Sequence, residues 1–162
     1  MRTIVRRTAL VVLAPAAAIG MTLAAPADPA SASLRTSTLE AQVVSLTNKA
    51  RVRAGCERLV ISRTLSKAAE RHSADMVRNR FFSHTGANGS RFTERTRRAG
   101  FTRRAMGENI AWGYRDARGV MRGWLNSPGH RRNIMNCQST QIGVGAVRNS
   151  DGVLYWTQEF GN

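Results

Sequence analysis

Apolar residues recur every three to four positions near the start of the main domain, which predicts a helix over 38–54 that ends at Gly55. Ser37 and Glu40 stand three residues apart just ahead of this run, in the pattern of a capping box. We therefore expect the helix to begin at about residue 38.

The same spacing predicts four further helices, over 66–79, 92–99, 116–125 and 128–134. Pro128 suits the first turn of the last helix and places His130 near its N-terminus, where the helix dipole favours a neutral imidazole. His72 lies within the apolar stripe of the helix over 66–79. His72 could be either a buried structural histidine or a ligating residue.

The pattern changes period in the last third of the chain. Two segments, 141–147 and 153–160, read as strands, and Asn149-Ser150-Asp151-Gly152 between them is typical of a hairpin turn. The glycine-bounded segment 107–113 is expected to be extended and to present Glu108. Helices followed by a hairpin indicate an α+β domain.

The N-terminus has the form of an export signal. Three arginines precede an apolar run over 8–25, and Ala30-Ser31-Ala32 is a small-x-small cleavage pattern. A membrane anchor is the alternative, although the apolar run is short for a spanning helix. The predicted division is a signal peptide over 1–32, a short tail over 33–36 and a single domain over 37–162, secreted from the cell.

Residues 33–162 carry 22 basic and 9 acidic residues, a net charge of +13, and Lys49 and Lys67 are their only lysines. Such a charge attracts polyanions, which outside a cell include envelope polymers and anionic lipid surfaces. A solvated basic surface without a specific partner is the alternative. The arginines are scattered and not interleaved with aromatic residues, which argues against sequence-specific nucleic-acid binding.

Cys56 and Cys137 are the only cysteines. In an exported protein two cysteines predict one disulfide, which would close a loop of about 80 residues and stabilise the fold by roughly 3 to 4 kcal/mol. A cysteine nucleophile is the competing interpretation, but neither residue lies in a nucleophile motif.

Several short motifs in a fixed order make the chain resemble the bacterial, secreted (SCP-like) branch of the CAP superfamily, which comprises cysteine-rich secretory proteins, antigen 5 and pathogenesis-related proteins. The motifs are Ala69-Glu70-Arg71-His72-Ser73-Ala74-Asp75-Met76, Phe82-Ser83-His84-Thr85, Gly107-Glu108-Asn109-Ile110-Ala111, the segment 124–134 with Ser127-Pro128-Gly129-His130, Ile142-Gly143-Val144-Gly145 and Tyr155-Trp156-Thr157-Gln158. The resemblance covers nearly all of the domain. It implies a three-layer α-β-α sandwich with a central antiparallel sheet.

The resemblance also implies a pocket of two histidines and two glutamates. His84, Glu108 and His130 match three of these positions. Asn126 and Ser127 stand near the place of the second glutamate, which is absent. We expect Asn109, Asn126 and Ser127 to line or support the pocket.

The three pocket residues allow more than one chemistry. His84, His130 and Glu108 could hold Zn²⁺ or another divalent cation, or act as catalytic groups, and Glu108 could instead be a structural acceptor. Ser127, His130 and Glu108 include the residue types of a serine hydrolase, but the Gly-x-Ser-x-Gly turn is missing.

We therefore expect a secreted, monomeric, non-enzymatic binding module whose pocket takes a small lipid, glycan or peptide and whose basic surface meets an anionic envelope polymer or lipid surface. The alternative is a metal-assisted hydrolase acting on peptide or cell-wall substrates.

Overall fold

The structure is a computed structural model that describes residues 29–162, so most of the predicted signal peptide lies outside the described residues. The elements in chain order are α1 (Pro29–Arg53), β1 (Val60–Ile61), α2 (Arg63–Asn79), α3 (Phe92–Arg98), β2 (Ala105–Trp112), α4 (Ala117–Asn126), α5 (Pro128–Ile134), β3 (Gln141–Arg148) and β4 (Leu154–Gly161).

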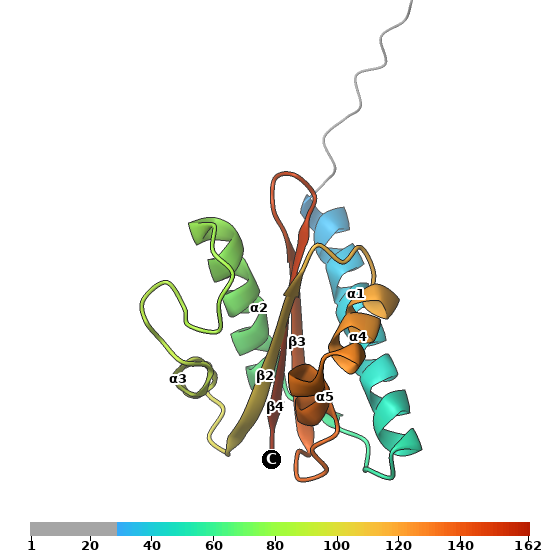
Figure 1. Cartoon of the computed structure of the whole chain (residues 1–162). Coiled ribbons are helices and arrows are strands. Elements are labelled where there is room, and N and C mark those ends of the chain that lie inside the picture. The colour runs from blue at the N-terminus through green and yellow to red at the C-terminus, as the bar shows by residue number, and fades with distance from the viewer. Residues whose placement is uncertain (1–28) are drawn as a thin grey trace, which may run out of the picture.

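The four strands form one sheet in the order β1-β3-β4-β2, in which β1 pairs parallel with β3 and the other pairs are antiparallel. Helices α2 and α3 cover one face of the sheet, and α1, α4 and α5 cover the other (Figure 1). The expected α+β, three-layer α-β-α sandwich is confirmed.

The first helix begins earlier than the sequence pattern predicts. Helix α1 starts at Pro29, so residues 33–36 are helical and do not form a tail. The capping-box prediction is wrong because Ser37 and Glu40 lie inside the helix. Glu40 Oε1 instead accepts a hydrogen bond from the amide of Ala146 at 2.9 Å, which ties α1 to β3.

The remaining helices and strands agree with the predicted segments to within a few residues. Helix α2 begins at Arg63 after an N-cap at Ser62, whose side chain accepts a hydrogen bond from the amide of Leu65. The hairpin between β3 and β4 turns at Gly152, which has a φ of +78°. The spacing of apolar residues along the chain therefore predicted which segments are helices and which are strands.

Strand β3 uses its two faces differently. Ile142, Val144 and Ala146 point into the hydrophobic core below α1 and α4. Gly143 and Gly145 alternate with them and face α2, where an added Cβ would overlap the helix backbone. The two glycines therefore let α2 pack directly on the sheet.

The main core lies between the sheet and the layer of α1, α4 and α5. Trp124, Trp156 and Phe160 are its largest buried aromatic side chains. The indole of Trp124 donates to the carbonyl of Ile110 at 3.1 Å, so its polar atom is satisfied. This contact fixes α4 against β2, the strand that carries Glu108.

The predicted disulfide between Cys56 and Cys137 is confirmed and joins segments 81 residues apart. Arg51 lies near it, fully buried, and donates to four main-chain carbonyls, those of Glu57, Ile134, Asn136 and Ser139. Arg51 is thus a structural residue and not part of the basic surface. Within residues 29–162, no helix is long and apolar enough to cross a membrane.

Candidate functional site

Glu108 is the centre of a buried group of charged side chains. It lies on β2, is only 5% exposed and accepts hydrogen bonds through both carboxylate oxygens. Oε1 accepts from Nδ1 of His84 at 2.7 Å, and Oε2 accepts from the guanidinium of Arg95 at 2.5 Å. Both oxygens are therefore occupied by protein donors.

These partners keep Glu108 ionised. Burial alone would raise the pKa of Glu108, but the hydrogen bond from His84 and the charge of Arg95 outweigh it and hold the pKa below its ordinary value. An ionised Glu108 fixes the proton of His84 on Nδ1. In the neutral imidazole, Nε2 of His84 is then free to accept a hydrogen bond or bind a metal ion.

Glu159 is a second buried acid beside Glu108. It stands directly opposite Glu108 in the register of β2 and β4 and is fully buried. Its carboxylate oxygens accept no hydrogen bond from the described residues. Burial first, and the nearby Glu108 carboxylate second, raise the pKa of Glu159 well above its ordinary value. We therefore treat Glu159 as the protonated member of the pair, able to donate to Glu108.

His72 supports the loop that carries His84. Its Nε2 lies 3.0 Å from the carbonyl oxygen of Ser83 and 3.9 Å from Oε2 of Glu108. Burial lowers the pKa of His72, so the neutral ring donates to Ser83. His72 is fully buried, which matches the structural alternative for this residue.

His130 is brought to the site by Asn109 and Asn133. The Asn109 amide donates to the His130 carbonyl at 3.2 Å, and the Asn133 amide donates to the Glu108 carbonyl at 3.0 Å. These bonds join α5 to β2. Burial and, secondarily, the proximity of His84 lower the pKa of His130, so the neutral form is favoured.

His84 and His130 both line a cleft of about 600 Å³. Much of its wall is aromatic and exposed, formed by Phe82, Trp112 and Tyr114. The ring of Trp112 stacks on Tyr155 with 6.2 Å between centroids. The cleft therefore offers a broad apolar wall with two imidazoles at one side.

The other expected pocket residues divide between the cleft and its surroundings. Ser127 lines the cleft, whereas Asn126 is exposed at the end of α4 and does not line it. Asn109 is fully buried behind the cleft. Glu108 does not line the cleft either, and reaches it through its hydrogen bond to His84.

A zinc site with three protein ligands does not fit this arrangement. Residues 29–162 contain no group of three His, Cys, Asp or Glu side chains placed to hold a metal ion. Both oxygens of Glu108 are taken, one of them by the cation Arg95. Any divalent cation would thus have to rely on the two imidazoles and on ligands from solvent.

The residues of a serine hydrolase are also not assembled. Ser127 and His130 both line the cleft, but in the described part of the chain no hydrogen bond joins their side chains. His130 is oriented through its main-chain carbonyl, and among the described residues no carboxylate bonds to its ring, since Glu108 pairs with His84.

The sequence did not single out Arg95 or Glu159. Arg95 appears there as one of several scattered arginines, yet only 9% of its side chain is exposed. Glu159 lies in a strand buried on both faces, so the usual alternation that would mark an inward position is hidden. The signal that could have identified Glu159 is the presence of an acidic residue in a strand whose other residues are nearly all buried.

The cysteine-rich secretory protein (CAP) family model matches residues 44–160, which is most of the chain. The chain belongs to this family. Its membership agrees with the SCP-like resemblance inferred from the motifs around His84, Glu108 and His130.

Bacterial proteins are among those similar to this CAP chain. It is 40% identical over 131 residues to the uncharacterized protein YkwD of Bacillus subtilis, covering 80% of this chain and 49% of that protein. It is 37% identical over 123 residues to the uncharacterized membrane protein YlbC of Bacillus subtilis, covering 76% of this chain and 34% of that protein. The chain therefore spans half or less of the length of these two relatives.

Solved structures show the same fold. An extracellular protein containing an SCP domain from Bacillus anthracis is 32% identical with a TM-score of 0.77, covering 86% of this chain and 45% of that one. An outer surface protein from Borrelia burgdorferi is 25% identical with a TM-score of 0.69, covering 74% of this chain and 89% of that one. Both structures are of proteins described as lying outside the cell or at its surface.

Proposed function

We propose that this chain is a secreted, monomeric binding domain without enzymatic activity, whose cleft holds a small lipid, glycan or peptide. The single observation that carries the proposal is the state of Glu108. Its carboxylate is buried, both of its oxygens accept hydrogen bonds, and one of these bonds orients His84. An acid held in this way positions a ligand-binding imidazole and is not available to take up a proton during turnover.

The cleft supports a ligand with an apolar face. Phe82, Trp112 and Tyr114 are 46%, 54% and 39% exposed, which is unusual for such large side chains unless they contact a partner. Nε2 of His84 would accept a hydrogen bond from a hydroxyl or amide of the same ligand. Secretion is supported by the export-signal pattern, the disulfide and the extracellular proteins of similar fold.

The basic surface supports the second half of the proposal, which is recruitment to an anionic polymer or lipid surface of the cell envelope. Most arginines of the chain are exposed in the structure, whereas the side chains of Arg51 and Arg95 are buried or nearly buried and do not contribute to this surface. Long-range attraction from such a surface would raise the local concentration of the protein at the envelope.

The test is ligand binding followed by tryptophan fluorescence, because Trp112 and Trp124 line the cleft. The probes are tri-N-acetylglucosamine, oleate and a capped tripeptide, each titrated into the wild type, His84→Ala and Trp112→Phe. Val52→Ala, an exposed change on α1, is the matched control. We expect one probe class to bind, with at least tenfold weaker binding to His84→Ala and unchanged binding to the control.

Equal affinity of the wild type and His84→Ala for every probe would reject the cleft as the binding site. Turnover of peptide or wall fragments that is abolished by His84→Ala or His130→Ala would reject the non-enzymatic assignment and favour the hydrolase. Light scattering coupled to size-exclusion chromatography tests the monomer.

A further inference from the structure

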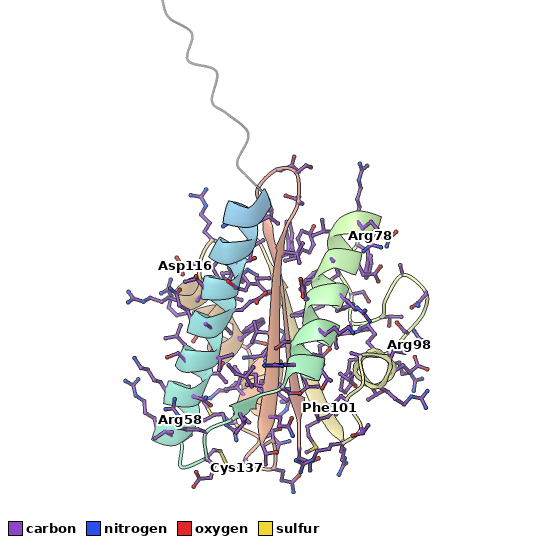
Figure 2. The ribbon with its side chains drawn as sticks, turned by 180° about the vertical axis from the view of Figure 1, so that it is seen from behind. Arg58, Arg78, Arg98, Phe101, Asp116 and Cys137 are labelled. Carbon is purple, nitrogen blue, oxygen red and sulfur yellow. A yellow bond between two sulfur atoms is a disulfide. The ribbon has the colours of Figure 1, made fainter. Side chains whose placement is uncertain are left out.

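A second hollow lies between α2, α3 and the loop over 80–91, and it shares no lining residue with the His84 cleft. It has a volume of about 620 Å³. Four of its lining residues are arginines, namely Arg71, Arg78, Arg95 and Arg98. Figure 2 shows Arg78 on α2 and Arg98 near the end of α3, on the same side of the molecule. We call this hollow the arginine groove.

The positive charge of the arginine groove is not balanced by its one acid. The Asp75 carboxylate accepts from the amide of Asn79 at 2.7 Å and from the main-chain amide of Ala87 at 3.0 Å, so it holds the loop. Within residues 36–162 no ion pair shorter than 4.0 Å joins Arg71, Arg78 or Arg98 to a carboxylate. Because Arg95 pairs with Glu108, the groove keeps three guanidinium groups without a carboxylate partner, and Asp75 is the one acid among the described residues that line it.

Arg95 adds an unsatisfied donor to the groove lining. Its side chain is 9% exposed, and its two terminal nitrogens donate to the Ser90 carbonyl and to Glu108. Among the described residues, the Nε of Arg95 has no hydrogen-bond partner. A buried donor without a partner is rare in native structures, and an ordered water or a ligand oxygen admitted by a small shift of the lining supplies the acceptor in such cases.

We propose that the arginine groove binds the phosphate groups of a phosphodiester-linked extracellular polymer. Guanidinium groups pair with phosphate oxygens through two parallel hydrogen bonds, and their fork geometry distinguishes them from lysine in this role. None of the described residues that line the groove is aromatic, so they offer nucleic-acid bases no surface on which to stack. The arginine groove therefore recognises the ligand through its phosphate groups.

The shape of the groove favours a slender chain over a bilayer. Arg95 is nearly covered, and a flat lipid surface contacts only groups that protrude from the protein. A single polymer strand can enter the hollow between α2 and α3 and reach Arg95. This inference rests on the part of the proposed function that assigns an anionic envelope partner, and it places that partner in one groove.

The experiment measures binding of a synthetic oligomer of six glycerol phosphates to the purified protein by calorimetry in 150 mM NaCl. The groove variant is Arg71→Ala/Arg78→Ala/Arg98→Ala, and the matched control is Arg103→Ala/Arg115→Ala/Arg132→Ala, which removes the same charge from exposed positions outside the groove. Alanine favours helix, so the changes in α2 and α3 keep the local structure.

We expect the groove variant to bind at least tenfold more weakly than the wild type and the control to lose less than threefold. The slope of log affinity against log salt should fall by roughly 2 in the groove variant, at about 0.7 for each phosphate that an arginine no longer neutralises.

Equal losses in the groove variant and the control would overturn the groove while leaving general electrostatic recruitment intact. No binding of the oligomer to the wild type would overturn the groove as well. If vesicles of phosphatidylcholine and phosphatidylglycerol do bind, with equal losses in both triple variants, the envelope partner is a lipid surface. If neither the oligomer nor the vesicles bind, both the groove and the anionic envelope partner of the proposed function are rejected.

Discussion

Glu108 and Glu159 face each other across β2 and β4 as a buried pair of acids with opposite protonation preferences. His84 and Arg95 stabilise the charge on Glu108, while Glu159 has no cation or amide to accept from among the described residues. Two neighbouring buried carboxylates cannot both ionise at low cost, so Glu159 keeps its proton while Glu108 is ionised. The arrangement explains why the acid of the cleft serves to orient His84.

Arg95→Met should destabilise the protein strongly. The change keeps the length of the side chain but leaves Glu108 without its cation in a buried setting, which typically costs about 3–5 kcal/mol. Urea denaturation at pH 7 measures the loss. Arg97→Met, at an exposed position of α3, is the control and should change stability by less than about 0.5 kcal/mol. Equal effects would show that Arg95 does not compensate Glu108.

Glu159→Gln should remove a loss of stability that accompanies rising pH in the wild type. The pKa of Glu159 is raised in the folded protein, so the folded state holds the proton more tightly than the unfolded chain does. That contribution is fully present below the unfolded pKa and is lost as the pH rises toward the folded pKa. Thermal unfolding from pH 5 to 9 should show a falling melting temperature for the wild type and a flatter curve for Glu159→Gln.

Glu40→Gln tests the same effect in α1, away from the cleft. Burial raises the pKa of Glu40 from 4.5 to about 7, so the wild type should lose stability between these pH values as Glu40 ionises. We expect a loss of about 1–2 kcal/mol, because solvent screens this partly exposed side chain. The variant keeps the oxygen that accepts from Ala146 and should lose less over that range. Glu57→Gln, at an exposed position, should behave like the wild type.

Cys56→Ser/Cys137→Ser should lower the free energy of unfolding by about 2–5 kcal/mol, because the disulfide restricts the unfolded chain over 81 residues. Denaturant titration with and without reductant measures this. Reductant should destabilise the wild type and leave the double variant unchanged. A similar shift in both would mean that the reductant acts elsewhere.

Zinc titration by calorimetry tests whether the imidazoles of His84 and His130 or the carboxylate of Glu108 bind the metal ion. His84→Ala and His130→Ala should each abolish measurable Zn²⁺ binding, whereas Glu108→Gln should weaken it by roughly 10- to 100-fold, because Glu108 orients the His84 imidazole without being a ligand itself. Loss of Zn²⁺ binding in Glu108→Gln with retention in His130→Ala would make the carboxylate a ligand after all.

Much of the fold was predictable because its local signals agree with one another. Pro128 starts α5, Gly152 turns the β3–β4 hairpin, and the alternation of Gly143 and Gly145 with apolar residues reflects the two faces of β3. The start of α1 was not predictable, because Ser37 and Glu40 form a capping pattern that the longer helix overrides.

The sequence alone determined the family, the disulfide and the residues His84, Glu108 and His130, because these depend on residue type, order and spacing. The tertiary structure decided what Glu108 does. Arg95 comes from α3, 13 residues before Glu108, and Glu159 comes from β4 at the other end of the domain, and only folding brings both to the Glu108 carboxylate. Protonation depends on burial and on neighbouring charge in space, and neither is written in the spacing of residues along the chain.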